Sequence, residues 1–344
     1  MNPECARSHA NLIGRMRAFR DTLSNKSLHP SPPVDDTQPP RRNRAFTRFW
    51  HSAAVREFRH LFSVQRWYRQ ATAPQRKLPD FIIAGAQKSG TTSLFAYLCE
   101  HPLVTPPITK EMSFFDNQFH RGLNWYRAHF PRDVTSSVDG GSGMPTLTGE
   151  SSAYYLFHPH TAARIANTLP GVKIIVLLRN PVDRAFSHYQ LNLRRGNEHL
   201  SFEKAIDAEA RRLAGEHDLM RAFDQYASFA HEKHSYLARG RYAEQLAVWR
   251  RHFRPDQLLI IESGQFFADT AKEFDRVQDF LGLPWWQPKK FGNRFPGKYR
   301  EKISPAMRSR LTDYFAPHNE RLYQMLWQRF DWGPRTVAPS AAQG

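Results

Sequence analysis

The feature that most constrains this chain is a short glycine-containing loop between an apolar run and a helical segment. Phe81–Ala84 are apolar, and residues 85–93 read Gly-Ala-Gln-Lys-Ser-Gly-Thr-Thr-Ser ahead of a helix expected over about 91–100. Backbone N–H groups in such a loop, together with the positive end of the helix dipole, bind anions. Its glycines let the chain turn tightly and approach an oxyanion closely. We therefore predict an anion site at residues 85–93, the phosphate loop.

The phosphate loop differs from the loop that binds ATP with magnesium. That loop follows the pattern G-x-x-x-x-G-K-[ST], in which a lysine follows the second glycine and a hydroxyl holds Mg²⁺. Here the glycine spacing is kept, but Thr91 stands at the lysine position and Lys88 lies inside the loop. A second apolar run, residues 173–178, ends in Arg179, where an NTPase usually has an acid for magnesium. A cation at this position favours a second phosphate over a metal.

From residue 79 onward, strand-like and helical stretches alternate. The strand-like runs are 81–84, 147–150, 173–178 and 258–261. The helical stretches are about 91–100, 160–168, 182–194, 201–213, 240–252, 270–281 and 304–329. Alternation of this kind predicts an α/β fold with a P-loop-like central parallel sheet and helices on both faces. The run at 173–178 has no polar alternation, which is typical of a strand covered on both sides.

Charge and cysteine content bound the partners and the compartment. The chain has 49 lysines and arginines against 32 acids, a net charge of +17, which favours a polyanionic partner: nucleic acid, acidic lipid, anionic glycan or phosphorylated cofactor. Its two cysteines, Cys5 and Cys99, suit a reducing compartment. We see no signal-peptide core and no apolar run of about 18 residues. The expected location is the cytoplasm.

The ends of the chain differ from its centre. Residues 1–40 are polar and finish in a proline-rich stretch, which predicts a flexible tail, and 333–344 predict another. Residues 41–78 combine arginines with aromatics at helical spacing. This basic amphipathic helix either packs on the following domain, the more frequent arrangement, or lies on an anionic membrane, at the inner face of the cell membrane. Residues 79–332 are expected to form the catalytic domain.

Two motifs are similar to those of sulfotransferases that depend on 3′-phosphoadenosine-5′-phosphosulfate (PAPS). Residues 87–93 resemble the family's 5′-phosphosulfate loop, and residues 178–189 resemble its 3′-phosphate motif. The resemblance implies PAPS as the sulfuryl donor and adenosine 3′,5′-diphosphate (PAP) as the product. The implied donor-binding residues are Gln87, Lys88, Ser89, Gly90, Thr91, Thr92, Ser93, Arg179 and Ser187.

Further segments resemble the branch that contains the heparan sulfate N- and 3-O-sulfotransferases. Residues 110–116 read Lys-Glu-Met-Ser-Phe-Phe-Asp, and the resemblance implies that Glu111 is the catalytic base, with Lys110 and Asp116 beside the acceptor. A sugar hydroxyl or amine needs a base, because it is a weak nucleophile until its proton is removed. Lys88 would stabilise charge on the departing oxygen without a metal. A late basic loop resembles the family's cover over the adenosine part: Gly297, Lys298, Tyr299 and Arg300.

Departures from the branch bear on the acceptor. Ser151 stands where the heparan enzymes commonly have a lysine, and the late loop lacks the flanking cysteine pair of secreted relatives. The first argues against assuming heparan itself as the acceptor, and the second agrees with a bacterial-type cytoplasmic enzyme. The acceptor is expected to be a carbohydrate or glycan. Arg194 and Arg195 begin a basic region, 194–240, that would suit an already anionic glycan. Ser151, Arg194 and Arg195 complete the predicted acceptor residues, and whether oxygen or nitrogen is sulfated stays open.

Two other classes of protein compete with this interpretation. A P-loop kinase or NTPase would need magnesium and ATP, against which Thr91 and Arg179 argue. A non-catalytic basic module on nucleic acid or membrane would explain the charge but would leave Lys88, Glu111 and Arg179 without a purpose. The histidines have no convincing ligand spacing, so no metal is predicted, and no nucleic acid is expected as partner.

Overall fold

A computed structural model describes residues 66–133, 146–292 and 302–333. The predictions for the tail 1–40, for residues 41–65 of the basic helix, for the late loop Gly297–Arg300 and for 334–344 lie outside these residues. Residues 66–71 are helical and are followed by the short 3₁₀ turn η1 (Ala73–Gln75). No helix within the described residues is long and apolar enough to cross a membrane.

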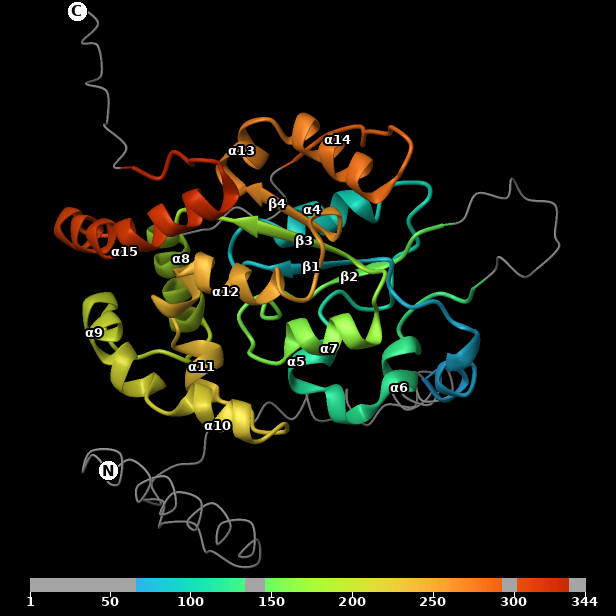
Figure 1. The fold of residues 1–344 in the computed structure, drawn as a ribbon, viewed down its shortest axis with the longest axis horizontal. Coiled ribbons are helices and arrows are strands. Elements are labelled where there is room, and N and C mark those ends of the chain that lie inside the picture. The colour runs from blue at the N-terminus through green and yellow to red at the C-terminus, as the bar shows by residue number, and fades with distance from the viewer. Residues whose placement is uncertain (1–65, 134–145, 293–301, 334–344) are drawn as a thin grey trace, which may run out of the picture. The chain divides into compact units, whose positions relative to one another are not determined.

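A parallel sheet forms the centre of the described structure. It has four strands in the order β2 (Gly149–Ser151), β1 (Phe81–Gly85), β3 (Lys173–Leu178) and β4 (Leu258–Glu262) (Figure 1). The residues of β1 are all buried, and so are those of β3 after its first. Their continuous apolar sequence is therefore explained by cover on both faces. The predicted α/β class with a central parallel sheet is confirmed.

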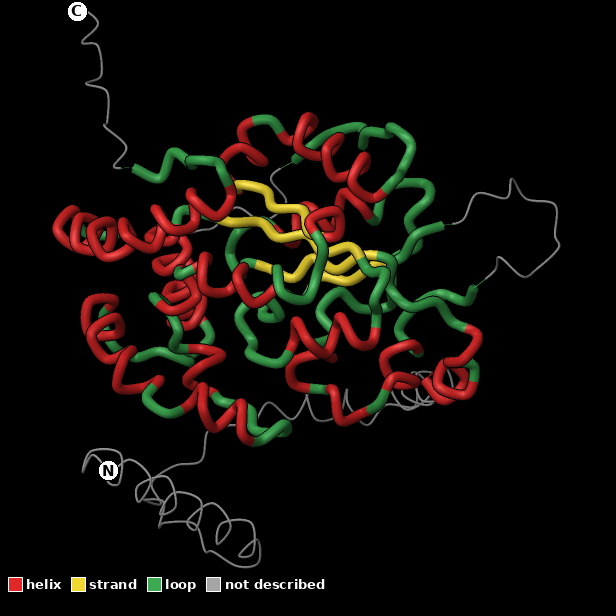
Figure 2. The backbone as a smooth tube through the Cα atoms, in the orientation of Figure 1, coloured by secondary structure: helices red, strands yellow, loops and turns green. Residues whose placement is uncertain are grey.

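Helices cover both faces of the sheet (Figure 2). Side chains alternate along a strand, so Ile83 and Ile175 face one side while Ile82 and Ile174 face the other. The first side packs against α4 (Thr91–Leu98), α13 (Ser263–Ala268) and α14 (Thr270–Leu281). The second packs against α5 (Phe114–Asn117), α6 (Leu123–Arg127), α7 (Thr161–Thr168) and α12 (Tyr242–Trp249). The sheet is thus the middle layer of three.

A third apolar cluster holds a helical region, residues 181–240, beside the sheet. Its helices are α8 (Pro181–Arg194), α9 (Phe202–Leu213), α10 (Glu216–Ala222) and α11 (Phe229–Lys233), followed by the 3₁₀ turn η4 (Ala238–Gly240). The long helix α15 (Pro305–Leu326) joins the cluster through Met307, Leu311 and Phe315 and also packs on α12. Figure 2 shows the helical region as helices and loops. The remaining 3₁₀ turns are η2 (Phe119–Arg121) and η5 (Pro255–Gln257).

Every predicted strand and helix from residue 79 onward is present, with ends that shift by a few residues. The structure adds α5, α6, α10, α11 and α13, which have four to seven residues each. Helices of one or two turns show too little of the 3.6-residue period to be recognised from apolar spacing. They form because the surrounding core provides contacts that an isolated short helix lacks.

Candidate active site

The phosphate loop connects β1 to α4 at the carboxyl edge of the sheet. Ala86 N donates to Leu177 O of β3 at 2.7 Å, and Ser89 N donates to Ala86 O at 3.2 Å, so the loop is fastened to the sheet and to itself. Lys88 and Gly90 have positive φ angles of 74° and 99°. This left-handed conformation costs a non-glycine residue about 1–2 kcal/mol. A residue with this strained backbone conformation beside a helix N-terminus is typical of anion-binding and catalytic sites.

The two motifs found in the sequence meet at this edge. Arg179 follows β3 directly, and its Nη1 donates to Lys88 O at 3.0 Å across a separation of 91 residues. Tyr242 of α12 donates to Arg179 O at 2.9 Å, which holds the strand end in place. Helix α8 begins at once because Pro181 occupies its first turn and the Asn180 side chain accepts from Val182 N at 3.0 Å. These contacts place Arg179 beside the phosphate loop, which itself contains Lys88.

Ser187 lies two turns into α8 and is buried. The structure places it on the helix that begins two residues after Arg179, as the sequence predicted. Its role in binding a phosphate stays a prediction.

Lys110 links Glu111 to the start of α4. Lys110 Nζ donates to Thr92 Oγ1 and, at 3.3 Å, to Glu111 Oε1. The Glu111 side chain is 60% exposed. An ion pair this exposed adds little stability, so its main effect is to place a carboxylate next to the phosphate loop. The predicted base is therefore both near the loop and accessible, and its catalytic role stays a prediction.

A second carboxylate, Glu150, is fully buried at the end of β2. Three hydroxyls converge on it: Tyr126 donates to Oε1, Ser152 donates to Oε2 at 2.8 Å, and Tyr155 lies 3.2 Å from Oε1. Burial raises the pKa of Glu150 to about 7. The sequence did not single out this residue. The available signal was an acid at the end of the predicted strand 147–150.

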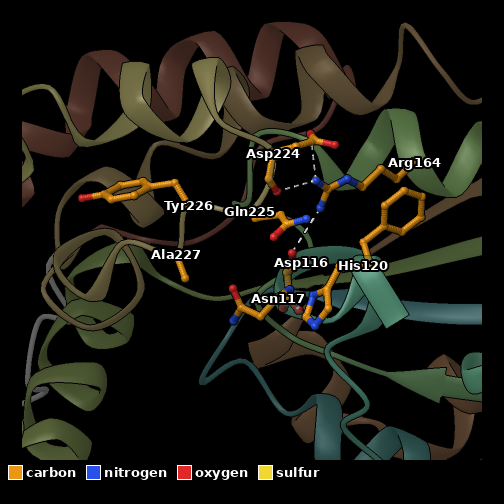
Figure 3. Close-up of a pocket in the computed structure, with 9 residues that line it drawn as sticks. Asp116, Asn117, His120, Arg164, Asp224, Gln225, Tyr226 and Ala227 are labelled. Carbon is orange, nitrogen blue, oxygen red and sulfur yellow. Dashed lines mark hydrogen bonds and ion pairs between the residues drawn. The ribbon is translucent and has the colours of Figure 1, made fainter. Parts of the chain in front are cut away.

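A pocket opens between α5, α7 and residues 224–227 (Figure 3). Arg164 joins its walls, donating to Asp116 O at 3.1 Å and to Asp224 Oδ1 at 3.0 Å. Asp116 lines the pocket and is buried, and its Oδ2 has no hydrogen-bond partner among the described residues. Burial, with Glu232 nearby, raises the pKa of Asp116 to about 7. Such a carboxyl can accept a hydrogen bond from a ligand or give one.

Arg239 connects the helical region to the phosphate loop. Although it is buried, its Nη1 donates to Gln87 Oε1 at 3.0 Å and its Nε donates to Ser235 Oγ at 2.8 Å. Its guanidinium also lies 4.5 Å from the centre of the Tyr154 ring. Burial lowers the pKa of Arg239 to about 10, so it stays charged at neutral pH. From the sequence, this residue was one of the cations in the basic region 194–240.

The predicted basic lining between 194 and 240 is not one surface. Arg212 pairs at 2.6 Å with the buried Glu198, and Arg239 faces inward. Arg194 and Arg195 are exposed at the far end of α8, about 20 Å along the helix from Arg179. Their role in binding the acceptor stays a prediction.

Two further sequence-based assignments can be placed. Ser151 is fully buried, its Oγ has no hydrogen-bond partner among the described residues, and its backbone N donates to Lys110 O at 3.3 Å. Its role beside the acceptor stays a prediction. In the part of the chain that is described, no group of three His, Cys, Asp or Glu side chains could hold a metal. Burial lowers the pKa of His158 to about 3 and that of His231 to about 2.

Comparison with known proteins gives concordant matches. A family model described as the sulfotransferase domain matches residues 78–291. Human heparan sulfate glucosamine 3-O-sulfotransferase 6 is 31% identical over 282 residues, covering 75% of this chain and 75% of the relative. The human bifunctional heparan sulfate N-deacetylase/N-sulfotransferase 3 is 31% identical over 76% of this chain, which spans only 31% of that protein. A crystal structure of a sulfotransferase from Alicyclobacillus acidocaldarius is 31% identical, with a TM-score of 0.53, and the match covers 74% of this chain and 99% of that one.

Proposed function

Because this chain belongs to the sulfotransferase domain family and is a PAPS-dependent enzyme, we propose that it transfers the sulfuryl group to a hydroxyl or amine of a carbohydrate. The observation that carries the proposal is the contact of Arg179 with Lys88 O. It brings the two anion-binding motifs to one edge of the sheet. A donor with a phosphosulfate at one end and a 3′-phosphate at the other needs such a pair of sites.

The residues at this edge fit the donor. The phosphosulfate would be held by Lys88 and by the backbone N–H groups at the start of α4. The 3′-phosphate would be held by Arg179, which uses one of its five N–H donors on Lys88 O, and by Ser187. Ser89 adds a buried hydroxyl whose Oγ has no hydrogen-bond partner among the described residues. When bound, PAPS supplies the sulfuryl group.

Residues of this chain would assist the transfer in two ways. Glu111, the proposed base, takes the proton of the acceptor hydroxyl or amine as that atom attacks sulfur. Lys88 stabilises the negative charge that develops on the departing phosphate oxygen. Lys110 supports both steps because its contacts with Thr92 and Glu111 keep the base beside the loop.

For the acceptor we infer a carbohydrate bound partly in the Asp116 pocket. One support is that the two human relatives are named for heparan sulfate, a carbohydrate. Another is the net charge of +17, which suits an anionic polymer. Asp116 lines this pocket, and its buried Oδ2 has no hydrogen-bond partner among the described residues. Arg194 and Arg195 would bind a more distant part of such a polymer, while Lys110 and Ser151 would lie nearer the reacting sugar.

We also infer a cytoplasmic location and a contact with an anionic membrane through residues 41–78, although Ala73 and Arg76 at the end of this segment are buried against the domain. The support is the paucity of cysteine and the basic amphipathic pattern of that segment. Flotation of the full-length chain with phosphatidylglycerol vesicles, compared with phosphatidylcholine vesicles, tests the membrane contact. Equal recovery with both vesicles would contradict it.

The donor is tested by calorimetric titration of the full-length chain with PAP, ATP–Mg²⁺ and an oligonucleotide in turn. We expect PAP to bind without added metal and more tightly than the other two. Tight binding of ATP–Mg²⁺ with none of PAP would favour an NTPase. Binding of the oligonucleotide alone would favour a basic module.

The acceptor is tested with radiolabelled PAPS and three polysaccharides: heparan sulfate, N-deacetylated heparosan and neutral dextran. We expect label on the first two and not on dextran. Label on none of them, with PAP binding intact, would contradict a carbohydrate acceptor of this class.

A further inference from the structure

The segment that carries Glu111 is bound on both sides to the end of β2 and the residues that follow it. Before Glu111, Lys110 O accepts from Ser151 N at 3.3 Å. After it, Ser113 N donates to Ser152 Oγ at 3.4 Å, and Phe114 N donates to the Tyr155 hydroxyl at 2.8 Å. Phe115 N donates to the same hydroxyl at 3.3 Å. A backbone amide and two side-chain hydroxyls therefore bind residues 110–115, in addition to the core packing of Phe114 and Phe115 and the bond that Arg164 donates to Phe115 O at 2.9 Å.

Both of those hydroxyls depend on Glu150. Ser152 Oγ donates to Glu150 Oε2 at 2.8 Å, and the Tyr155 hydroxyl donates to the same carboxyl at 3.2 Å. A tyrosine hydroxyl has one proton and two lone pairs. When Tyr155 donates its proton to Glu150, both lone pairs remain for Phe114 N and Phe115 N. The buried carboxyl thus sets the direction in which Tyr155 presents its lone pairs.

We propose that Glu150 is a positioning residue for the transfer reaction. Acting through Tyr155 and Ser152, it holds the backbone of residues 113–115 so that Glu111 stays beside the phosphate loop. The inference rests on the proposed role of Glu111 as base.

A carboxyl with only a structural role would be energetically unfavourable at this position. Removing a carboxyl from water carries a large cost, and an apolar group of similar size often stabilises a core as well. Glu150 is fully buried and contacts only hydroxyl groups among the hydrogen bonds described for it, with no cation. Its demonstrable effect is to order the hydroxyls that bind residues 113–115. A misplacement of a reacting group by about 1 Å can lower a rate by about 100-fold.

The chain contains a matched pair of tyrosines for the test. Tyr126 and Tyr155 are both fully buried, and both contact Glu150 Oε1 through their hydroxyls. Of the two, Tyr155 is the one whose hydroxyl also accepts from the backbone of residues 114 and 115. Tyr155→Phe and Tyr126→Phe therefore each remove one hydrogen bond to the carboxyl, while Tyr155→Phe alone releases the segment.

The first measurement is amide hydrogen exchange at Phe114 and Phe115 in the full-length protein. We expect Tyr155→Phe and Glu150→Gln to speed exchange at these amides relative to Tyr126→Phe. Equal exchange in the two tyrosine variants would overturn the proposal. Should Glu150→Gln fail to fold, the tyrosine pair still decides the result.

The second measurement is turnover with heparan sulfate as the acceptor probe. We expect Tyr155→Phe to lower kcat by at least about tenfold and to leave PAP binding unchanged, because the donor loop is not part of the network. Tyr126→Phe should keep kcat within about threefold. A parallel loss of PAP binding and kcat would indicate general damage to the fold instead.

Measurements of kcat in the Glu111→Gln variant distinguish the positioning role of Glu150 from the proposed role of Glu111 as the base. If Tyr155 acts through Glu111, adding Tyr155→Phe to Glu111→Gln should lower kcat little further, since contacts in one network are not additive. Full multiplication of the two effects would overturn the positioning role. If Glu111→Gln alone keeps normal kcat, the assignment of the base fails, and amide exchange then decides whether Glu150 orders the segment.

Discussion

At the scale of single residues, Arg239 shows how a distant side chain can control the donor loop. It is buried and donates to Gln87, the residue before Lys88, from a position 152 residues away. Lysine at this position would keep the charge but lose the planar fork that bonds several acceptors at once. We propose that Arg239 acts on the donor site by holding Gln87 in place.

We expect Arg239→Lys to weaken PAP binding by roughly tenfold, because a hydrogen bond from a charged group contributes about 1.5–3 kcal/mol. Titration calorimetry measures the PAP affinity of each variant, after circular dichroism has shown that the variant is folded. Arg212→Lys is the matched control, since Arg212 pairs with Glu198 in the same helical region. An equal loss of PAP affinity in both variants would count against the link through Gln87.

Lys88 is the residue with the sharpest expected kinetic effect. We expect Lys88→Ala to lower kcat by about 100- to 1,000-fold, the range found when one group that stabilises developing charge is removed. The melting temperature should change little, because this half-exposed side chain contributes little to the core. Lys204→Ala, an exposed lysine on α9, serves as the control. Near-normal turnover of Lys88→Ala would remove the lysine from the mechanism.

At the scale of elements, the junction between the phosphate loop and α4 depends on Gly90. Its φ of 99° is left-handed, and a Cβ there would lie 2.9 Å from Phe267 Cζ of α13. Both the backbone and the neighbouring helix therefore favour glycine. The loop and α13 are coupled at this point.

We expect Gly90→Ala to lower the free energy of unfolding by at least about 1–2 kcal/mol and to weaken PAP binding. Gly196→Ala isolates the backbone cost, because Gly196 has a φ of 70° and nothing within 4 Å of the added Cβ. Chemical denaturation of both variants gives the two free energies. Equal losses would mean that the contact with Phe267 adds no cost, since α13 shifts to relieve it.

At the scale of the whole molecule, two buried carboxyls make stability depend on pH. Burial raises the pKa of Asp116 and that of Glu150 to about 7 from ordinary values of 3.8 and 4.5. At pH values between the ordinary and the raised pKa, both carboxyls are deprotonated in the unfolded chain but protonated in the folded chain. The contribution of these two carboxyls to the free energy of unfolding should therefore fall as pH rises from about 4.5 to 7, by up to about 1.4 kcal/mol per pH unit for each group. The buried His158 and His231, whose pKa values are lowered, contribute in the opposite direction.

Melting temperatures of the parent, Asp116→Asn and Glu150→Gln across this pH range test the prediction. Each variant lacks one titrating carboxyl, so its melting temperature relative to that of the parent should rise as pH increases across this range. A difference between variant and parent that does not change with pH would contradict the raised pKa of that carboxyl.

Much of the fold was predictable from the sequence because its signals are local. An unbroken apolar run such as 173–178 indicates a strand covered on both faces, and a strand, a glycine loop and a helix in direct succession indicate an anion site. The order of these elements predicted the parallel sheet. Very short helices escaped, since they depend on contacts made by the rest of the core.

The sequence by itself determined the fold class and the phosphate loop with Lys88. It also indicated a second cation, Arg179, at the end of the strand 173–178. Only the tertiary structure decided which side chains meet: Arg239 with Gln87, Tyr155 with the backbone beside Glu111, and Arg212 with Glu198. The physical reason is that composition does not reveal which face of a helix is buried. Arg194 and Arg239 look alike as sequence, yet one is exposed at a helix end and the other is enclosed beneath the donor loop.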